Sequence, residues 1–354
     1  MTLPAWLGLP ELAAGAAALA LNAYVLMGGA DFGGGVWDLL ARGPRRDEQR
    51  ALISRAIGPI WEANHVWLII VIVLLFTAFP PAFAVLGTVL HVPLTLMLVG
   101  IVLRGSAFVF RSYGSGDERA ERRWGRAFAI ASTATPVLLG VCVGAIATGD
   151  VGAASARLAA MAAGATAPSF HEVYIAPWLA PFPLAVGFLA LVLFAFLAGV
   201  YLTLETDREA LREDFRRHAL SAAVLAFGAA FGALALSPGE APRLREGLLA
   251  APWALPLQLG IAVAAVTAIA ALWRRHFRLA RFAAAAQVSL MLWGWLIAQF
   301  PYLIPTTLSI RSAAAPRVTL QLMLAGLAAG TAILIPSLLY LFRTFGGARA
   351  GRRA

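Results

Sequence analysis

Ionisable side chains stand inside long apolar stretches of this sequence, where a charge is costly and usually serves a function. Four of them can be named: Asp31, Glu62, His65 and Arg104. Glu62 and His65 are three residues apart and can share one helix face. Three further side chains surround them: Trp61, Asn64 and Trp67. Chains of Asp, Glu and His conduct protons through membranes, so this group is a candidate proton route.

A structural role for the same residues is an equal alternative. Arg104 could neutralise Asp31 or Glu62, and then nothing in the group would titrate. Two neighbouring residues favour structural roles: Asp38 is expected to be a solvated charge at a helix end, and His91 a hydrogen-bonded packing histidine. His65 or His91 is a weak candidate for a haem ligand, because haem in a helical bundle usually needs ligands that face it.

The composition identifies the elements that must hold these residues. Of 354 residues, 60% are hydrophobic and 13% are charged, whereas soluble domains have about 25% charged residues. Nine apolar stretches approach the roughly 20 residues that cross a bilayer as a helix. They are residues 9–37, 60–80, 82–110, 125–147, 180–204, 219–237, 253–273, 283–304 and 319–342. The sequence therefore predicts one all-α transmembrane domain over residues 1–354, a polytopic bundle of about nine helices.

The arginines predict the orientation of this bundle. Twenty-two of the 28 basic residues, all of them arginine, lie in alternate connections or after the last stretch. Positive residues favour the cytoplasmic side, so we expect the N-terminus outside and the C-terminus in the cytoplasm. This topology places Asp31, Glu62, His65 and Arg104 at one depth, in the cytoplasmic half of the membrane. The net charge of +10 then reflects topology, and no nucleic-acid partner is expected.

Several cofactor chemistries are not expected. The single cysteine, Cys142, offers neither a CxxC pair nor a haem attachment motif. The five histidines include only two inside the apolar stretches, His65 and His91. We therefore expect neither a metal site nor haem bound directly by this chain.

A second unusual motif, WGWLIAQFPYLIPTTLSI, occurs in the eighth apolar stretch. Pro301 and Pro305 should break the helix near its outer end, and Tyr302 adds an aromatic ring near the interface. A kinked exit from the membrane explains these residues without any further role.

Four motifs together resemble subunit II of cytochrome bd-type quinol oxidases, in order, spacing and the nine-span layout. They are GGADFGGGVWDLL, GPIWEANHVWLI, LRGSAFVFRSY and FPYLIPTTLSI. The resemblance implies a haem-free subunit in the bacterial plasma membrane, paired with a subunit I that holds b- and d-type haems. That complex oxidises quinol and reduces oxygen to water with cytoplasmic protons. It can include a small accessory membrane subunit, and subunit II can hold a lipid or quinone.

Residue by residue, the resemblance carries over several positions. Asp31 and Glu62 match acids of the family's proton path, and Asn64 matches its asparagine. The other matches are Trp61, Trp67, Arg104, Arg111, Pro301, Tyr302 and Pro305. Two carboxylates of the family pattern are replaced, by Gly28 and Val109. The path would therefore run through Asp31, Glu62 and His65 alone, or protons would arrive through the partner.

Two other functions remain alternatives. A secondary transporter would also have broken helices and charged groups within the membrane, but it should have a polar site near the midplane. A membrane scaffold would need none of these charges to titrate.

Overall fold

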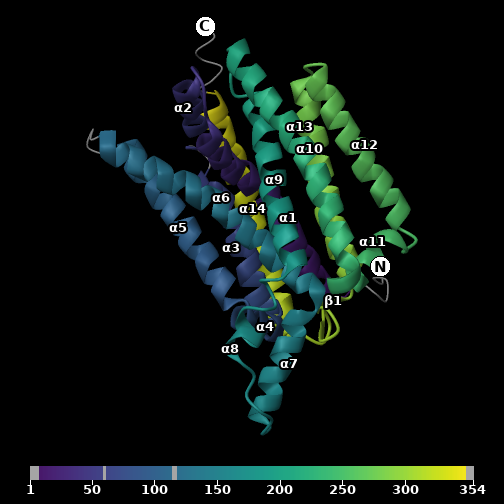
Figure 1. Cartoon of the computed structure of the whole chain (residues 1–354). Helices are drawn as coiled ribbons and strands as arrows, with labels where there is room; N and C mark the ends of the chain where they lie inside the picture. Colours follow the sequence, from purple (N-terminus) through teal and green to yellow (C-terminus); the bar gives the residue numbers. More distant parts are fainter. Residues whose placement is uncertain (1–7, 59–60, 114–117, 348–354) are drawn as a thin grey trace.

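The computed structural model describes residues 8–58, 61–113 and 118–347, without the side chains of 61–63, 112, 113, 118 and 341–347. The protein is an all-α multi-pass membrane bundle (Figure 1). Its helices are α1 (Leu9–Leu40), α2 (Arg46–Ile57), α3 (Trp61–Ala78), α4 (Pro80–Val89), α5 (His91–Tyr113), α6 (Glu118–Thr148), α7 (Asp150–Ala162), α8 (Phe170–Tyr174), α9 (Pro181–Leu202), α10 (Glu209–Glu240), α11 (Pro242–Leu249), α12 (Ala254–Trp273), α13 (Phe277–Gln299) and α14 (Arg317–Gly347). Two short antiparallel strands, β1 (Tyr302–Ile304) and β2 (Leu308–Ser309), follow α13.

Eight of the described helices are long and apolar enough to span a membrane, and α3 with α4 makes a ninth if that bent pair is one span. The bundle of about nine predicted spans thus corresponds to eight or nine spans in the structure, but the predicted boundary between the second and third is wrong. Residues 82–89 belong to α4, which is bent by 117° from α3, and the third span begins at His91. Pro80 and Pro81 cause this break, because proline lacks an N–H donor and restricts the residue before it.

The end of the eighth predicted span is also wrong. Helix α13 begins at Phe277 and ends at Gln299, and the chain then enters the hairpin of β1 and β2. The motif that begins at Phe300 contains two prolines, which cannot donate the backbone hydrogen bonds of a helix. The predicted break of the helix is therefore confirmed, but the helix ends at Gln299, before the predicted end of the span at residue 304.

Helices α1 and α9 form the centre of the bundle, where their backbones touch. A Cβ atom on Gly33 would lie 1.9 Å from the carbonyl oxygen of Phe194. Helix α9 is buried along most of its second half, and α6 and α10 pack against it. Small residues allow such close approach in membranes, and this packing fixes the position of α1 and its polar side chains.

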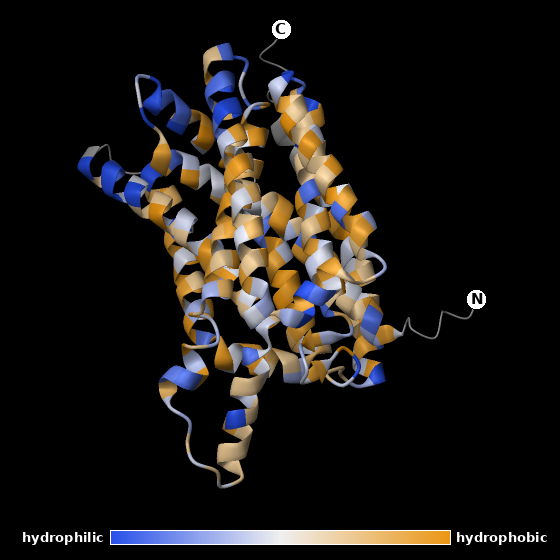
Figure 2. Ribbon diagram, turned by 45° about the vertical axis from the view of Figure 1, so that its right-hand side comes forward, coloured by the Kyte–Doolittle hydropathy of each residue, from blue (hydrophilic) through white to orange (hydrophobic). Residues whose placement is uncertain are grey.

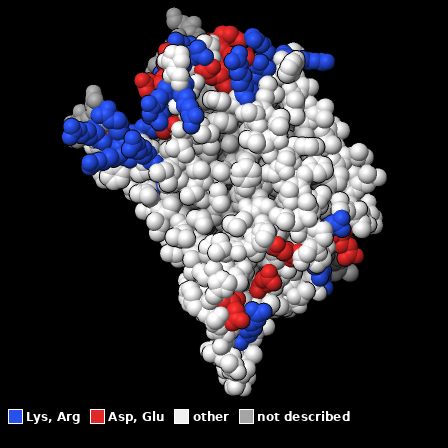
Figure 3. All heavy atoms as spheres, viewed as in Figure 1, with Lys and Arg blue, Asp and Glu red and all other residues white. Residues whose placement is uncertain are grey.

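Charged side chains gather at the two ends of the bundle, and the arginines are concentrated at one of them (Figures 2 and 3). That end, called the arginine end here, carries α2, the α9–α10 and α12–α13 connections and the last turns of α14 (Figure 1). The N-terminus of α1, α4, α7 and the hairpin lie at the opposite end (Figure 1). The alternation of arginines along the sequence thus becomes a separation in space.

Candidate functional site

The centre of the site is a buried ion pair between α1 and α5. A nitrogen, Nη2, of Arg104 lies 2.5 Å from Oδ1 of Asp31, and each side chain is only 1% exposed. The sequence left open whether Arg104 neutralises Asp31 or Glu62, and Asp31 is its partner here. Two opposite charges placed in an apolar interior compensate much of each other's desolvation cost.

Helix α6 completes the surroundings of Arg104. The Nε of Arg104 donates a hydrogen bond to the hydroxyl of Ser132 at 3.1 Å, and the guanidinium lies 4.8 Å from the ring centre of Phe32 and 5.2 Å from that of Phe128. Gly35 makes this contact possible, since a Cβ there would lie 2.2 Å from the Cβ of Ser132. The glycine-rich segment of α1 therefore lets α6 approach the ion pair.

Several polar atoms near the start of α3 and on α1 are buried without a hydrogen-bond partner among the described residues. They are Oδ2 of Asp31, both amide atoms of Asn64 and Nε1 of Trp67. Asn64 is 0% exposed. It lies three residues before Trp67, on the same helix face, and Trp67 packs against the cluster of Tyr24, Phe32 and Phe194. Buried polar groups of this kind commonly bind ordered water.

His65 lies beside the same cluster. Its ring centre is 6.0 Å from that of Phe32 and 6.3 Å from that of Tyr24. The structure thus brings together Asp31, Arg104 and the aromatic neighbours of His65 and Trp67. The side chains of Trp61 and Glu62 lie outside the described residues, so the predicted place of Glu62 beside this group stays a prediction.

Asp38 contradicts the expectation of a solvated helix-end charge. Its side chain is 1% exposed, and Oδ1 lies 3.1 Å from Nη1 of Arg111 and 3.8 Å from Nε of Arg50. Arg50 also donates to the Asp38 carbonyl, and burial lowers the pKa of this guanidinium while Asp38 opposes that effect. The expectation failed because α2 folds back over the end of α1.

The sequence contained a signal for this second ion pair. Asp38 follows Asp31 by seven residues, and Arg111 follows Arg104 by the same interval. Seven residues are about two helical turns. If α1 and α5 run parallel and form the Asp31–Arg104 pair, Asp38 and Arg111 therefore lie opposite each other two turns further on. Asp31–Arg104 and Asp38–Arg111 are both separated by 73 residues along the chain.

The other candidate residues lie elsewhere. His91 contacts the carbonyl of Thr88 through Nδ1 at 2.9 Å, and its ring stands 4.9 Å from that of Tyr174. It begins α5, at the opposite end from His65 near the start of α3, so the two histidines do not face one position. The expected packing histidine is thus found at residue 91.

The late motif also lies far from the ion pairs, at the hairpin. The backbone N–H of Ile310 donates to the carbonyl of Pro301 at 2.8 Å, and Pro305 lies between the two strands. The guanidinium carbon of Arg243 is 4.2 Å from the ring centre of Tyr302. These contacts close the end of the bundle opposite the arginine end, between α11 and α13, and give the motif a structural role.

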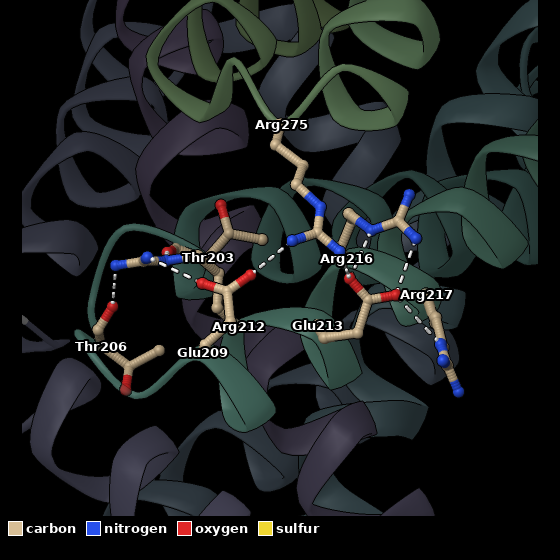
Figure 4. A network of polar contacts seen from close by, with 8 residues as sticks. All are labelled: Thr203, Thr206, Glu209, Arg212, Glu213, Arg216, Arg217 and Arg275. Carbon is tan, nitrogen blue, oxygen red and sulfur yellow. Dashed lines mark hydrogen bonds and ion pairs between the residues drawn. The ribbon is translucent and has the colours of Figure 1, made fainter.

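A polar network at the arginine end was not anticipated from the sequence (Figure 4). Glu213 of α10 binds Arg216 at 2.7 Å and Arg217 at 3.1 Å, and Arg275 of the α12–α13 turn reaches it at 3.4 Å. Nearby, Arg45 binds Asp214 at 2.6 Å, and this hydrogen bond raises the pKa of the Arg45 guanidinium. The network ties α2 and the α12–α13 turn to α10.

Comparisons with known proteins identify the family. The family described as "Cytochrome bd terminal oxidase subunit II" matches residues 9–345. A "Putative cytochrome bd menaquinol oxidase subunit II" of Bacillus subtilis (strain 168) is 32% identical over 101 residues, which are 28% of this chain and 29% of that protein. A "Cytochrome bd-I ubiquinol oxidase subunit 2" of Escherichia coli (strain K12) is 31% identical over 100 residues, which are 28% of this chain and 26% of that protein. The aligned parts thus span less than a third of these relatives.

A solved structure shares the fold along nearly the whole chain. The bd oxidase from Geobacillus thermodenitrificans matches with a TM-score of 0.76 at 21% identity, over 95% of this chain and 98% of that one. The family match covers far more than half of the sequence and joins the motifs of α1, α3, α5 and the hairpin. This chain therefore belongs to the family of cytochrome bd terminal oxidase subunit II.

Proposed function

We propose that this chain is the haem-free subunit of a bd-type quinol oxidase in the bacterial plasma membrane, with its N-terminus outside. Its partner, a haem-bearing subunit I, would hold the b- and d-type haems and carry out quinol oxidation and oxygen reduction. The printed names of the Bacillus and Escherichia relatives support a quinol oxidase, and the family match supports the pairing. The arginine-rich end supports the orientation, because such residues favour the cytoplasmic side.

We further propose that the chain helps to deliver protons from the cytoplasm. One observation carries this proposal: a buried carboxylate, Asp31, keeps Oδ2 unbonded among the described residues, while Asn64, equally buried, keeps its whole amide unbonded. Bound water would satisfy both groups and give protons a hydrogen-bonded route. Arg104 occupies the other oxygen of Asp31. Asp31 would therefore order the water, while Glu62 and His65 exchange protons along it.

Substitution of Glu62 tests this route. We expect Glu62→Ala to slow quinol-driven oxygen consumption of the purified complex roughly tenfold or more, because loss of a proton-transferring group commonly costs that much. Glu246→Ala is the matched control, since Glu246 is an exposed acid of α11 at the opposite end. The haem absorption spectrum of both variants checks that the complex is assembled. Unchanged turnover in a fully assembled Glu62→Ala complex would remove Glu62 from the route.

A further inference from the structure

The turn between α12 and α13 is unusually basic. Residues 274–281 contain four arginines and no acid. Arg275 points away from this turn toward α10, where it binds Glu209 at 2.8 Å and Glu213 at 3.4 Å (Figure 4). The other three, Arg274, Arg278 and Arg281, are exposed. They form a group that we call the turn arginines.

All three arginines of α10 at the same end are paired with acids, as are Arg45 and Arg208, and the turn arginines are not. The pairs are Arg45–Asp214, Arg208–Glu48, Arg212–Glu209, Arg216–Glu213 and Arg217–Glu213. Among the described residues, no acid lies within ion-pair distance of Arg274, Arg278 or Arg281. Orientation alone requires basic residues at this end, but it does not require that these three lack a counter-charge. They therefore present an unbalanced positive surface.

Exposed apolar side chains border the turn arginines on both sides. Trp273 directly precedes Arg274 and is 73% exposed, and Phe282 directly follows Arg281 and is 74% exposed. Each ring belongs to a candidate membrane-spanning helix, at its arginine end. Aromatic rings favour the level where lipid headgroups meet the hydrocarbon. The turn arginines thus lie at headgroup level, beside surface suited to acyl chains.

One contact and one helix end also favour an anion at this surface. The guanidinium of Arg281 lies 5.0 Å from the ring centre of Tyr201 on α9, which holds it on the same helix face as Arg278, three residues earlier. Helix α13 begins without a side-chain hydrogen bond from its N-cap, His276. Its first backbone N–H groups have no partner within the helix, and they favour a negative group near Arg274 and Arg278.

We propose that the turn arginines bind the phosphodiester of an anionic glycerophospholipid, whose acyl chains lie along Trp273 and Phe282. Guanidinium groups bind phosphate oxygens in pairs, and clusters of basic residues next to membrane helices recognise anionic headgroups. The bordering aromatic rings select a lipid over a soluble phosphate. This site is separate from the ion pairs of α1 and does not depend on the proposed oxidase activity.

The test uses the full chain, purified as the complex that it forms in the membrane. This complex is placed in phosphatidylcholine nanodiscs. Phosphatidylglycerol is then titrated in, and bound lipid is measured by native mass spectrometry. Each arginine near an anionic surface contributes about fivefold in affinity. We expect Arg274→Gln with Arg278→Gln to lower the preference for phosphatidylglycerol about 25-fold, and Arg274→Lys with Arg278→Lys to retain most of it.

Arg217→Gln is the matched control, because Arg217 is an exposed arginine at the same end that is already paired with Glu213. It should leave the preference unchanged. An equal loss in this control, or no loss in the double glutamine variant, would overturn the proposal. So would displacement of the lipid by inorganic phosphate at equal concentration, since the ligand would then be a soluble anion. Thermal unfolding in pure phosphatidylcholine checks that every variant is folded.

Discussion

Arg104 is a buried charge whose stability depends on its ion-pair partner, Asp31. It is almost fully buried, and its guanidinium is held by the carboxylate of Asp31 and the hydroxyl of Ser132. When one member of such a pair is removed, the other is left as an uncompensated charge in an apolar interior. Arg104 therefore joins α1, α5 and α6 through one ion pair and one hydrogen bond.

We expect Arg104→Leu to lower the free energy of unfolding by about 3–5 kcal/mol, the cost of breaking a buried ion pair. Thermal unfolding of the purified protein, followed by tryptophan fluorescence, measures the change. Arg208→Leu is the control, since both members of the Arg208–Glu48 pair are exposed and surface pairs contribute about 0–1 kcal/mol. Equal stability of the two variants would contradict this account. Adding Asp31→Leu to Arg104→Leu should restore part of the loss.

The sequence predicted the residues of this site better than their partners. Depth in the membrane, inferred from hydropathy and arginines, placed Asp31 and Arg104 at one level. The same reasoning predicted that Asp38 is exposed to solvent, because hydropathy does not show that α2 folds back over the end of α1. Asp31 and Asp38 are separated by the same seven residues as Arg104 and Arg111. Comparing these two spacings would have predicted the Asp38–Arg111 pair between parallel helices.

At the scale of helices, glycines determine how closely α1 and α9 approach. A methyl group at Gly33 would meet the Phe194 carbonyl at 1.9 Å and the Cβ of Ala198 at 2.8 Å. We expect Gly33→Ala to destabilise the protein by about 2 kcal/mol, because overpacking forces the backbones apart. The change is measured as a lower thermal midpoint in detergent.

Gly15→Ala is the control for this substitution in the same helix. A Cβ at Gly15 meets nothing within 4 Å, so the variant gains helix propensity without a clash, by up to about 1 kcal/mol. A Gly33→Ala protein as stable as Gly15→Ala would show that the two helices can separate without cost.

Helix positions followed from hydropathy, whereas the bend between α3 and α4 did not. Apolar runs of about 20 residues leave few other structures in a bilayer, so α6, α9 and α12 could be placed from sequence. The run from residue 66 to 90 is apolar on both sides of the break, and only Pro80 and Pro81 mark the bend at Phe79. Prolines are tolerated inside membrane helices as well, as Pro136 is in α6. A proline alone therefore cannot predict where a span ends.

At the scale of the whole molecule, the orientation inferred from the arginine end predicts which residues a reagent can reach from each side of the membrane. Cysteines introduced at Ala51 of α2 and at Ala167, before α8, lie at exposed positions of opposite ends. In a Cys142→Ala background, we expect a membrane-impermeant maleimide to label Ala167→Cys in intact cells. It should label Ala51→Cys only after the membrane is opened. The reverse pattern would invert the proposed orientation.

The interval of 73 residues between Asp31 and Arg104 also has a consequence for synthesis. When α1 leaves the ribosome, the arginine that neutralises its buried carboxylate does not yet exist, and Gly33 has no Phe194 to pack against. The nascent α1 must therefore wait at the insertion machinery, or in the membrane with its acid protonated or hydrated, until α5 arrives. Because Arg104 lies on α5, the buried charge of α1 is neutralised only after α5 has been inserted.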